Sequence, residues 1–474
     1  MAITSPAQHG LETGRRALHA QQASLNVASH NIANVNTPGY ARKRADMESA
    51  LSNTTSGIGN GADVAGISRM RSRFMDAQAR IEQQVLGRWE AINRALGSIE
   101  SIFNEPAGAG SSEAGTVFNE PSGIGLSGSL SRFWNAWQDL ANVPESGAAR
   151  AALRQEAQFL TNTLHQYRGQ LRQNRLELDI EVVDEVEEIN AILEEITELN
   201  AQIPRASFQE GSAADLKDQR DLLLERLSER VDISVVERDN GQISVLLSGH
   251  NLVEGDRAVN LRVRQLSSGD TISSQVFFED DGSLATVSEG RLRGLVEVRD
   301  QIVPDLLDRL DGIAAAMVEE VNALHRTGFG ADGGTGHNFF DPNKLAASNI
   351  AVDEDIVADL DNIAASQDGN SGDNGMAIAI SQVRNKHVLG GGSSTVDGFY
   401  NTLLGEVGAR SKEAQTMSSN HRLFAEQIEA RRQSVQGVSL NDEAAQLVLY
   451  QRAYQAAART VSIVDSLMET TINI

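Results

Sequence analysis

Two glycine-rich stretches of the sequence have spacings that could bind a phosphate or a cation. The stretch "GIGLSG", Gly123 to Gly128, matches the GxGxxG fingerprint that cradles a dinucleotide. It follows "FNEPS" rather than a strand, and no βαβ unit surrounds it. The stretch "DGNSGDNG", Asp368 to Gly375, resembles a calcium loop in composition, but its sixth position is Asp373 instead of glycine and its twelfth is not glutamate. We therefore expect two loops, with no cofactor and no bound calcium.

The titratable side chains form no motif that is typical of catalysis or metal binding. The 9 histidines include no HExxH pair, and neither a GxSxG elbow nor a P-loop is present. His421 has the phase of an apolar helix face, which predicts a buried, hydrogen-bonded histidine. The ten acids within 176–200 lie mostly off the apolar stripe, which indicates a solvated helix face. Cysteine is absent, which excludes disulfides and thiolate chemistry. We expect no catalytic residue and no metal site, and hence no enzyme.

Each end of the chain carries a narrow apolar stripe that repeats every seven residues, the spacing of a coiled-coil seam. Ser439 and Asp442 form a capping box that would start the C-terminal helix. Neither stripe has a partner nearby in sequence. We therefore expect the two helices to pack against each other, the alternative being that each docks separately on the body. The stripes, together called the terminal seam, are Leu11, Leu18, Leu25 and Ile32 at one end, and Leu440, Leu447, Tyr454, Val461 and Met468 at the other.

The stretch "NVNTPGYARKR" predicts a sharp end to the N-terminal helix near Asn36. Thr37 precedes a proline, which disfavours the helical region for Thr37. Pro38 and Gly39 suit the centre of a type II turn, because glycine adopts the positive φ that this turn requires. The predicted turn motif consists of Asn34, Asn36, Thr37, Pro38, Gly39 and Tyr40.

Long helices dominate the rest of the chain. Apolar residues at helical spacing predict helices over 70–103 and 399–435, and a third from Ser146, which can cap it, to Ile203, with Pro204 ending it. Within 228–290 the apolar period changes to two, and Asn-Gly and Asp-Gly pairs mark hairpin turns. The low aromatic content, 4%, favours aliphatic helix packing.

These patterns predict a mainly α, elongated, multi-domain protein. It would have a terminal paired-helix domain that resembles a coiled coil, a long helical bundle as its body and one inserted antiparallel β domain. The predicted domains are 1–52 with 438–474 for the terminal pair, 53–227 with 291–437 for the bundle, and 228–290 for the β insert.

Charge is distributed unevenly along the chain. The net charge is −24, which disfavours binding to nucleic acid or to anionic membranes. Residues 1–50 hold five bases and three acids, and residues 431–474 hold four of each, so the middle of the chain carries the negative charge. No apolar run is long enough to span a membrane, and the N-terminus lacks the apolar core of a cleavable signal.

Two signatures resemble those of the bacterial flagellar rod, hook and hook-associated proteins. "NIANVNTPGYAR", residues 31–42, is similar to the N-terminal signature of that family, and "YQRAYQAAARTVSIVDSLMETTINI", residues 450–474, to its C-terminal end. "VPESGAARAAL", "EEITELNAQI", "LDRLDGIAAAMVEEVNALHRTG" and the final "TTINI" resemble the hook-associated members in particular.

The resemblance implies a structural role. It implies a protein secreted through the type III flagellar export apparatus and assembled at the hook tip, outside the cell, as a tubular hook–filament junction. The implied partners are other copies of the chain, the hook protein, a second junction protein of the FlgL kind and an export chaperone of the FlgN kind. The resemblance also implies terminal helices that are disordered in the free monomer. The alternatives are another axial protein of the hook or rod, a coiled-coil scaffold without a flagellar role, and an unfamiliar enzyme in the β module.

Overall fold

The computed structural model describes residues 6–50, 59–103, 125–206, 212–268 and 271–472. The chain forms two compact units: one contains residues 1–87, 185–291 and 420–474, and the other contains residues 88–184 and 292–419. Three long helices contribute residues to both units, namely α2 (Arg73–Phe103), α4 (Gly147–Ala206) and α10 (Val396–Gln436). The prediction of a mainly α, multi-domain chain is confirmed, whereas the predicted domain boundaries stay a prediction.

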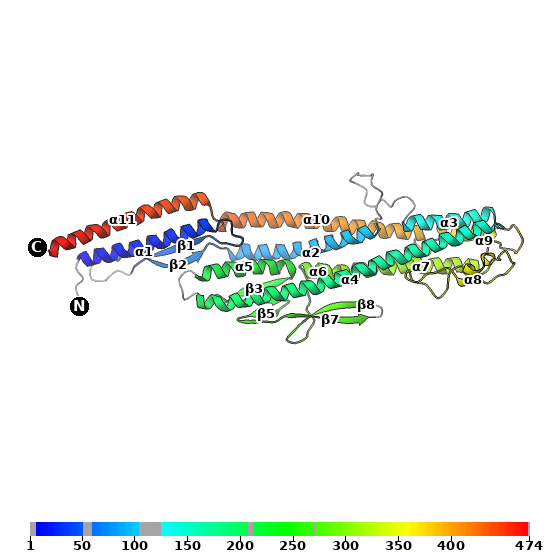
Figure 1. Ribbon diagram of the computed structural model, residues 1–474, viewed down its shortest axis with the longest axis horizontal. Helices are drawn as coiled ribbons and strands as arrows, with labels where there is room; N and C mark the ends of the chain where they lie inside the picture. Colours follow the sequence, from blue (N-terminus) through cyan, green and yellow to red (C-terminus); the bar gives the residue numbers. More distant parts are fainter. Residues whose placement is uncertain (1–5, 51–58, 104–124, 207–211, 269–270, 473–474) are drawn as a thin grey trace. The chain divides into compact units, whose positions relative to one another are not determined.

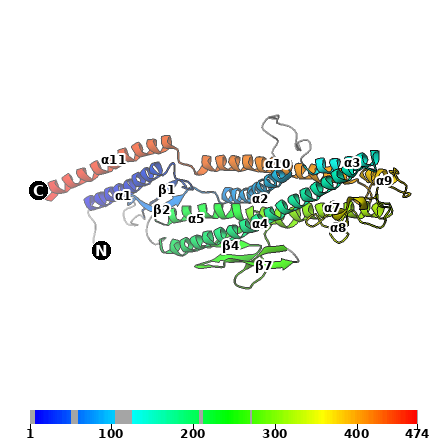
Figure 2. The ribbon, with the colours of Figure 1, turned by 45° about the vertical axis from the view of Figure 1, so that its right-hand side comes forward.

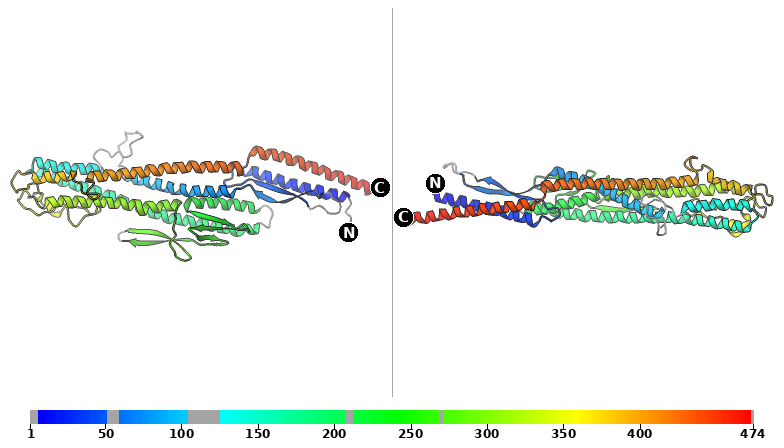
Figure 3. Two further views of the ribbon diagram at one scale, coloured as in Figure 1. Left: turned by 180° about the vertical axis from the view of Figure 1, so that it is seen from behind. Right: turned by 90° about the horizontal axis from the view of Figure 1, so that it is seen from above.

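The terminal helices pair within the first unit. Helix α1 (Pro6–Ala33) and helix α11 (Leu440–Ile472) lie side by side (Figures 1 and 3). They run antiparallel, because Gly10 faces Val464 and Gly14 faces Val461. The predicted pairing is therefore confirmed. A hairpin that the sequence did not suggest, β1 (Lys43–Ser49) with β2 (Ala62–Arg69), also packs on α1, where Arg16 pairs with Asp63 at 2.6 Å.

The predicted antiparallel β module is present, and it consists of two sheets. Figure 2 shows both of them beside α4. The four-stranded sheet consists of β3 (Ile233–Glu237), β4 (Ile243–Leu247), β5 (His250–Glu254) and β6 (Arg257–Ala258), and the two-stranded sheet of β7 (Leu261–Ser268) and β8 (Thr271–Phe278). Helix α5 (Ser212–Arg230) precedes them, so residues 228–230 are helical.

Two asparagines of α4 attach the sheets to the helix. Asn190 accepts a hydrogen bond from the backbone N–H of Leu261 and donates to its carbonyl, both at 2.8 Å. Asn200 does the same at Ile243, at 2.8 and 2.9 Å. Each amide side chain thus satisfies one donor and one acceptor of a strand end, which fixes the position of each sheet along α4.

Two predictions about the long helices need correction. Helix α4 continues through Pro204 to Ala206, because the side chain of Gln242 donates to the carbonyl of Asn200 at 3.3 Å. That carbonyl is the one that a proline four residues later leaves without a partner. Phe74 and Ile81, expected on the apolar stripe of α2, are exposed.

His421 is hydrogen-bonded as predicted, with its Nδ1 2.6 Å from Glu82 Oε1, but it is only partly buried.

The second unit has an aromatic core that the composition did not predict. Phe133, Trp134 and Trp137 of α3 (Leu126–Asn142) pack with Phe339 and Phe340. The 13 phenylalanines and 3 tryptophans of the chain are few, but the core of this unit gathers several of them in one place. The other elements are α6 (Arg291–Glu297), a π-helix (Val298–Ile302), α7 (Val303–His325), α8 (Glu354–Ala358), a 3-10 turn (Leu360–Asn362), α9 (Gly375–Ser381) and a second 3-10 turn (Gln382–Asn385).

The described residues of both glycine-rich stretches belong to the second unit. Residues 123 and 124 fall outside the described residues, and Gly125 precedes the first turn of α3. Residues 368–374 form a loop in which the Asp373 carboxylate accepts hydrogen bonds from the hydroxyl of Ser366 and the backbone N–H of Gly375. These bonds stabilise turns in the loop, which explains why the stretch is rich in aspartate and glycine.

A buried histidine makes the second unit sensitive to acid. Burial lowers the pKa of His325 to about 4, and its Nε2 accepts a hydrogen bond from Ala364 N–H, which requires the neutral ring. Below about pH 6.5 His325 binds a proton in the unfolded chain but stays neutral in the folded chain. The free energy of unfolding therefore decreases as the pH falls. We expect His325 to account for a loss of about 2 kcal/mol between pH 7 and pH 5.

Urea unfolding followed by tryptophan fluorescence tests this expectation, because Trp137 packs edge-on against His325. The matched variant is His325→Gln, which cannot be protonated. Its stability deficit relative to the parent protein should shrink by about 2 kcal/mol between pH 7 and pH 5. A deficit that stays constant over this range would show that His325 does not carry the effect.

Candidate functional site

Asn31 joins three chain segments where the terminal helices meet the rest of the first unit. Its side chain is buried near the end of α1, where its Nδ2 donates to Lys43 O at 2.9 Å and to Glu443 Oε2 at 3.1 Å. Its Oδ1 accepts from the Tyr40 hydroxyl at 2.8 Å and from Lys43 N–H at 3.0 Å. Buried Glu443, in the first turn of α11, accepts in turn from Arg42 Nε at 2.7 Å. One amide thus connects α1, the segment after the turn and the start of α11.

The predicted turn lies beside this asparagine. Helix α1 ends at Ala33, three residues earlier than expected, because the Asn34 side chain donates to the His30 carbonyl at 2.9 Å and thereby caps the helix. The Thr37–Tyr40 turn forms as predicted, with Tyr40 N–H donating to Thr37 O at 3.2 Å and Gly39 at a φ of 77°. Asn36 and Pro38 are exposed. Burial, with Asp215, Asp218 and Glu443 nearby, raises the pKa of Tyr40, so its hydroxyl keeps its proton.

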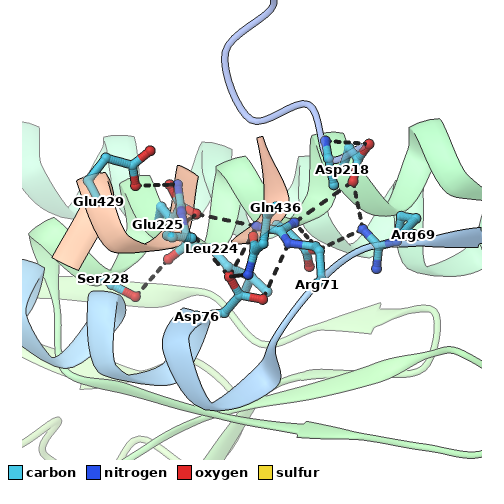
Figure 4. Close-up of polar contacts among 12 residues, drawn as sticks. Arg69, Arg71, Asp76, Asp218, Leu224, Glu225, Ser228, Glu429 and Gln436 are labelled. Atoms are coloured by element: carbon cyan, nitrogen blue, oxygen red, sulfur yellow. Dashed lines mark hydrogen bonds and ion pairs between the residues drawn. The ribbon is translucent and has the colours of Figure 1, made fainter. Parts of the chain in front are cut away.

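A cluster of arginines and carboxylates holds the segment that leads from β2 into α2 (Figure 4). Arg69 donates to Asp218 and Asp221, both at 2.8 Å, and Arg71 pairs with Asp221 and Asp76. On α10, Arg432 pairs with Glu225 of α5 and with Glu429. The cluster therefore fastens the start of α2 and the end of α10 to the same face of α5.

Burial makes this cluster depend on its pairing. Burial raises the pKa of Asp218, while hydrogen bonds from Arg69 and from Ala41 N–H oppose that rise. Burial also opposes the charge of Arg69, but Asp221 and Asp218 outweigh it and raise the pKa of the guanidinium. Removal of either partner would leave an unpaired charge in a dry environment, which is costly.

A cleft of about 830 Å³ lies between the turn that follows α1 and the segment that joins α10 to α11. Residues 35–42 form one wall and residues 432–439 another, and Arg42 N–H donates to Gln436 O across it at 3.0 Å. The lining residues include no histidine or cysteine, and its arginines are paired with carboxylates. This geometry suits the positioning of two helices against a body.

Comparison with known proteins agrees with this arrangement. Family models match residues 11–40 (flagella basal body rod protein), 111–340 (flagellar hook-associated protein FlgK helical domain) and 432–474 (flagellar basal body rod FlgEFG protein C-terminal). The flagellar hook-associated protein 1 of Bacillus subtilis is 30% identical, over 98% of this chain and 97% of that relative. The chain belongs to the hook-associated protein 1 (FlgK) family. The resemblance in the sequence is thereby confirmed.

More distant FlgK proteins agree over most of the chain. The hook-associated protein 1 of Salmonella typhimurium is 25% identical over 96% of this chain and 98% of that relative. The solved structure of the flagellar hook junction protein FlgK from Burkholderia pseudomallei shares the fold, with a TM-score of 0.63 at 16% identity, over 76% of this chain and all of that one. Among the described residues, no helix is both long and apolar enough to cross a membrane.

On α1 the terminal seam of this FlgK-family chain is not the most buried set of positions. Leu11, Leu18, Leu25 and Ile32 are all partly exposed. The fully buried positions of α1 are mostly small: Gly14, Ala20, Ser24 and Ala28, with Val27 and Asn31. A Cβ at Gly14 would lie 2.6 Å from Val461 Cγ2, so glycine is what allows the close approach.

On α11 the seam residues Leu447, Tyr454, Val461 and Met468 are partly exposed, and Leu440 is exposed. A second set of large apolar side chains lies exposed on this helix: Val448, Leu449, Ile463 and Leu467. We call these four residues the outer face of α11. The pair therefore leaves much of its large apolar surface uncovered, and the role of the seam in assembly stays a prediction.

The interpretation of the sequence missed Asn31, Arg42 and Glu443 as site residues. Asn31 stands in the quoted signature, and a buried amide is unusual on a helix face that is otherwise apolar or small. Glu443 directly follows the capping-box residue Asp442. The signal that could have identified them is an amide near the end of the first predicted helix together with a carboxylate near the start of its partner helix.

Proposed function

We propose that this chain is a structural subunit of the hook–filament junction of the bacterial flagellum. Copies would assemble as a tube at the hook tip, outside the cell, after type III export. The observation that carries the proposal is the uncovered apolar surface of the paired terminal helices in a chain of the FlgK family. Side chains such as Leu449 and Ile463 remain in water in a single copy, and neighbouring subunits would cover them.

The proposal includes specific partners. The hook protein would lie below the tube, and a second junction protein of the FlgL kind would lie above it. Before export, a chaperone of the FlgN kind would cover the apolar C-terminal helix, because such a surface invites aggregation in the cytoplasm. No catalytic step and no nucleic-acid binding form part of this function.

Electron microscopy of a strain that lacks the gene tests the proposal. We expect complete hooks without filaments, and monomeric filament protein in the medium. Expression of the chain from a plasmid should restore filaments. Truncated or missing hooks would point to a hook or rod protein instead, and normal filaments would contradict a junction role.

Hydrogen exchange on the purified protein gives a second prediction. The fully buried positions of α1 are mostly small and the large seam residues of both helices are at least partly exposed, whereas ordering the roughly 60 residues of the two helices costs on the order of 1 kcal/mol per residue or more. We therefore expect residues 6–33 and 440–472 to exchange freely in the free monomer and to become protected in the assembled junction. Strong protection of both helices in the monomer would contradict this expectation. The buried strand β4 serves as the protected internal reference.

A further inference from the structure

The tips of the two small sheets bring one imidazole and two carboxylates together. His250 opens β5, and Asp280 and Asp281 follow β8. Asp280 Oδ2 lies 3.0 Å from His250 Nε2, and Asp281 Oδ2 lies 4.0 Å from His250 Nδ1. His250 belongs to the four-stranded sheet and the two aspartates follow the last strand of the two-stranded sheet, so this cluster connects the two sheets.

Each of these side chains is held in place by the surrounding fold. The His250 ring stacks on the buried ring of Phe278, with centroids 4.0 Å apart and an angle of 18°. One oxygen of Asp280 accepts the backbone N–H of Asp281 at 2.8 Å, and one oxygen of Asp281 accepts the backbone N–H of Ser283 at 2.8 Å. Both oxygens of Asp280 face His250 Nε2, at 3.0 and 3.1 Å, whereas the second oxygen of Asp281 lies 4.0 Å from the other ring nitrogen, Nδ1.

This cluster differs from the arginine cluster of the first unit in its ionic partners. The carboxylates near Arg69, Arg71 and Arg432 are each paired with a guanidinium. Among the described residues, by contrast, no lysine or arginine forms an ion pair with Asp280 or Asp281, and their ionic partner is His250 alone. A divalent cation bound here would be neutralised by the two carboxylates.

We propose that His250, Asp280 and Asp281 form a binding site for a divalent transition metal such as Zn²⁺ or Mn²⁺. One possible ligand atom from each residue lies within 4.8 Å of the other two. Ligand atoms that share an ion at about 2.1 Å are about 3.0 to 4.2 Å apart. One ion binds only one imidazole nitrogen, so an ion at Nε2 beside Asp280 requires the half-exposed Asp281 side chain to rotate from Nδ1 toward Nε2. The imidazole selects against Mg²⁺ and Ca²⁺, which prefer oxygen. Water would fill the remaining positions, and the bound ion would join the two sheets.

Titration calorimetry of the full chain, free of any histidine tag, with ZnCl₂ and MnCl₂ tests the site. We expect binding of one ion that is weakened at least about tenfold in His250→Phe and in Asp280→Asn. Phenylalanine retains the stacking on Phe278, and circular dichroism would verify that the sheets remain folded. Bound metal should also slow hydrogen exchange in β5 and in residues 279–283 of the parent protein.

The matched control is His337→Phe. His337 pairs with Asp355 at 3.3 Å at the surface of the second unit and belongs to no three-residue cluster of this kind among the described residues. This variant should bind metal as the parent does. The proposal is overturned if the parent binds no ion up to about 1 mM, the weakest range of extracellular cation sites. It is also overturned if His250→Phe binds as tightly as the parent, in which case the three residues form only an ion pair.

Discussion

Replacement of Gly39 by valine should abolish assembly at the hook tip while the rest of the chain stays folded. Gly39 has a φ of 77°, and a Cβ at this position would lie 3.2 Å from Leu222 Cβ on α5. A β-branched residue resists this conformation at a cost on the order of 1–2 kcal/mol, and its Cβ would also press on the Leu222 side chain. The turn would then open and move Tyr40 away from Asn31, so α1 could no longer be held where α11 begins.

Motility and immunolabelling of hook tips measure this effect, and thermal unfolding measures the fold. Gly249→Val is the matched control, because Gly249 has a φ of 87° in the β4–β5 turn and a Cβ added there would meet open space within 4 Å. We expect similar backbone strain and normal motility in the control. Gly39→Asn should be milder than Gly39→Val, since asparagine tolerates positive φ. Normal incorporation of Gly39→Val would show that assembly does not need the turn.

The sequence predicted those features that depend on neighbours along the chain. Proline followed by glycine defines a turn locally, and Gly39 indeed has positive φ. The alternation of Ile243, Val245 and Leu247 predicted a strand with a buried face, and all three are buried. The seven-residue repeats likewise predicted that the terminal helices would pair, because an apolar stripe needs a partner.

Features that depend on contacts between residues far apart in the sequence could not be predicted in this way. The repeat of large residues suggested which positions of α1 pack, yet most of the fully buried positions are small residues that lie between them, and Gly14 allows α11 to approach closely. The bond between Asn31 and Glu443 joins residues 412 positions apart. Likewise, only the side chain of Gln242, 42 positions from Asn200, explains why α4 continues past Pro204.

Aspartate in place of both Leu447 and Val461 should prevent assembly and weaken chaperone binding at least tenfold, equivalent to about 1.4 kcal/mol. Val461 contacts α1 at Gly14, and both residues belong to the terminal seam. A carboxylate placed in an apolar groove loses its hydration without gaining a partner. Under the proposed function the same helix face binds the chaperone in the cytoplasm and α1 or a neighbouring copy in the tube. One pair of substitutions should therefore impair both steps.

Titration calorimetry with the FlgN-like chaperone separates this site from other surfaces. The control is Gln455→Asp, which adds the same charge at an exposed position of α11 and should bind the chaperone normally. A chain that ends at Ser439 lacks α11 altogether and should bind no chaperone. If that truncated chain binds as tightly as the complete one, the chaperone site lies elsewhere. If only assembly fails in the double variant while chaperone binding is unchanged, the two partners use different faces of α11, and the outer face with Leu449 and Ile463 becomes the surface to test for the chaperone.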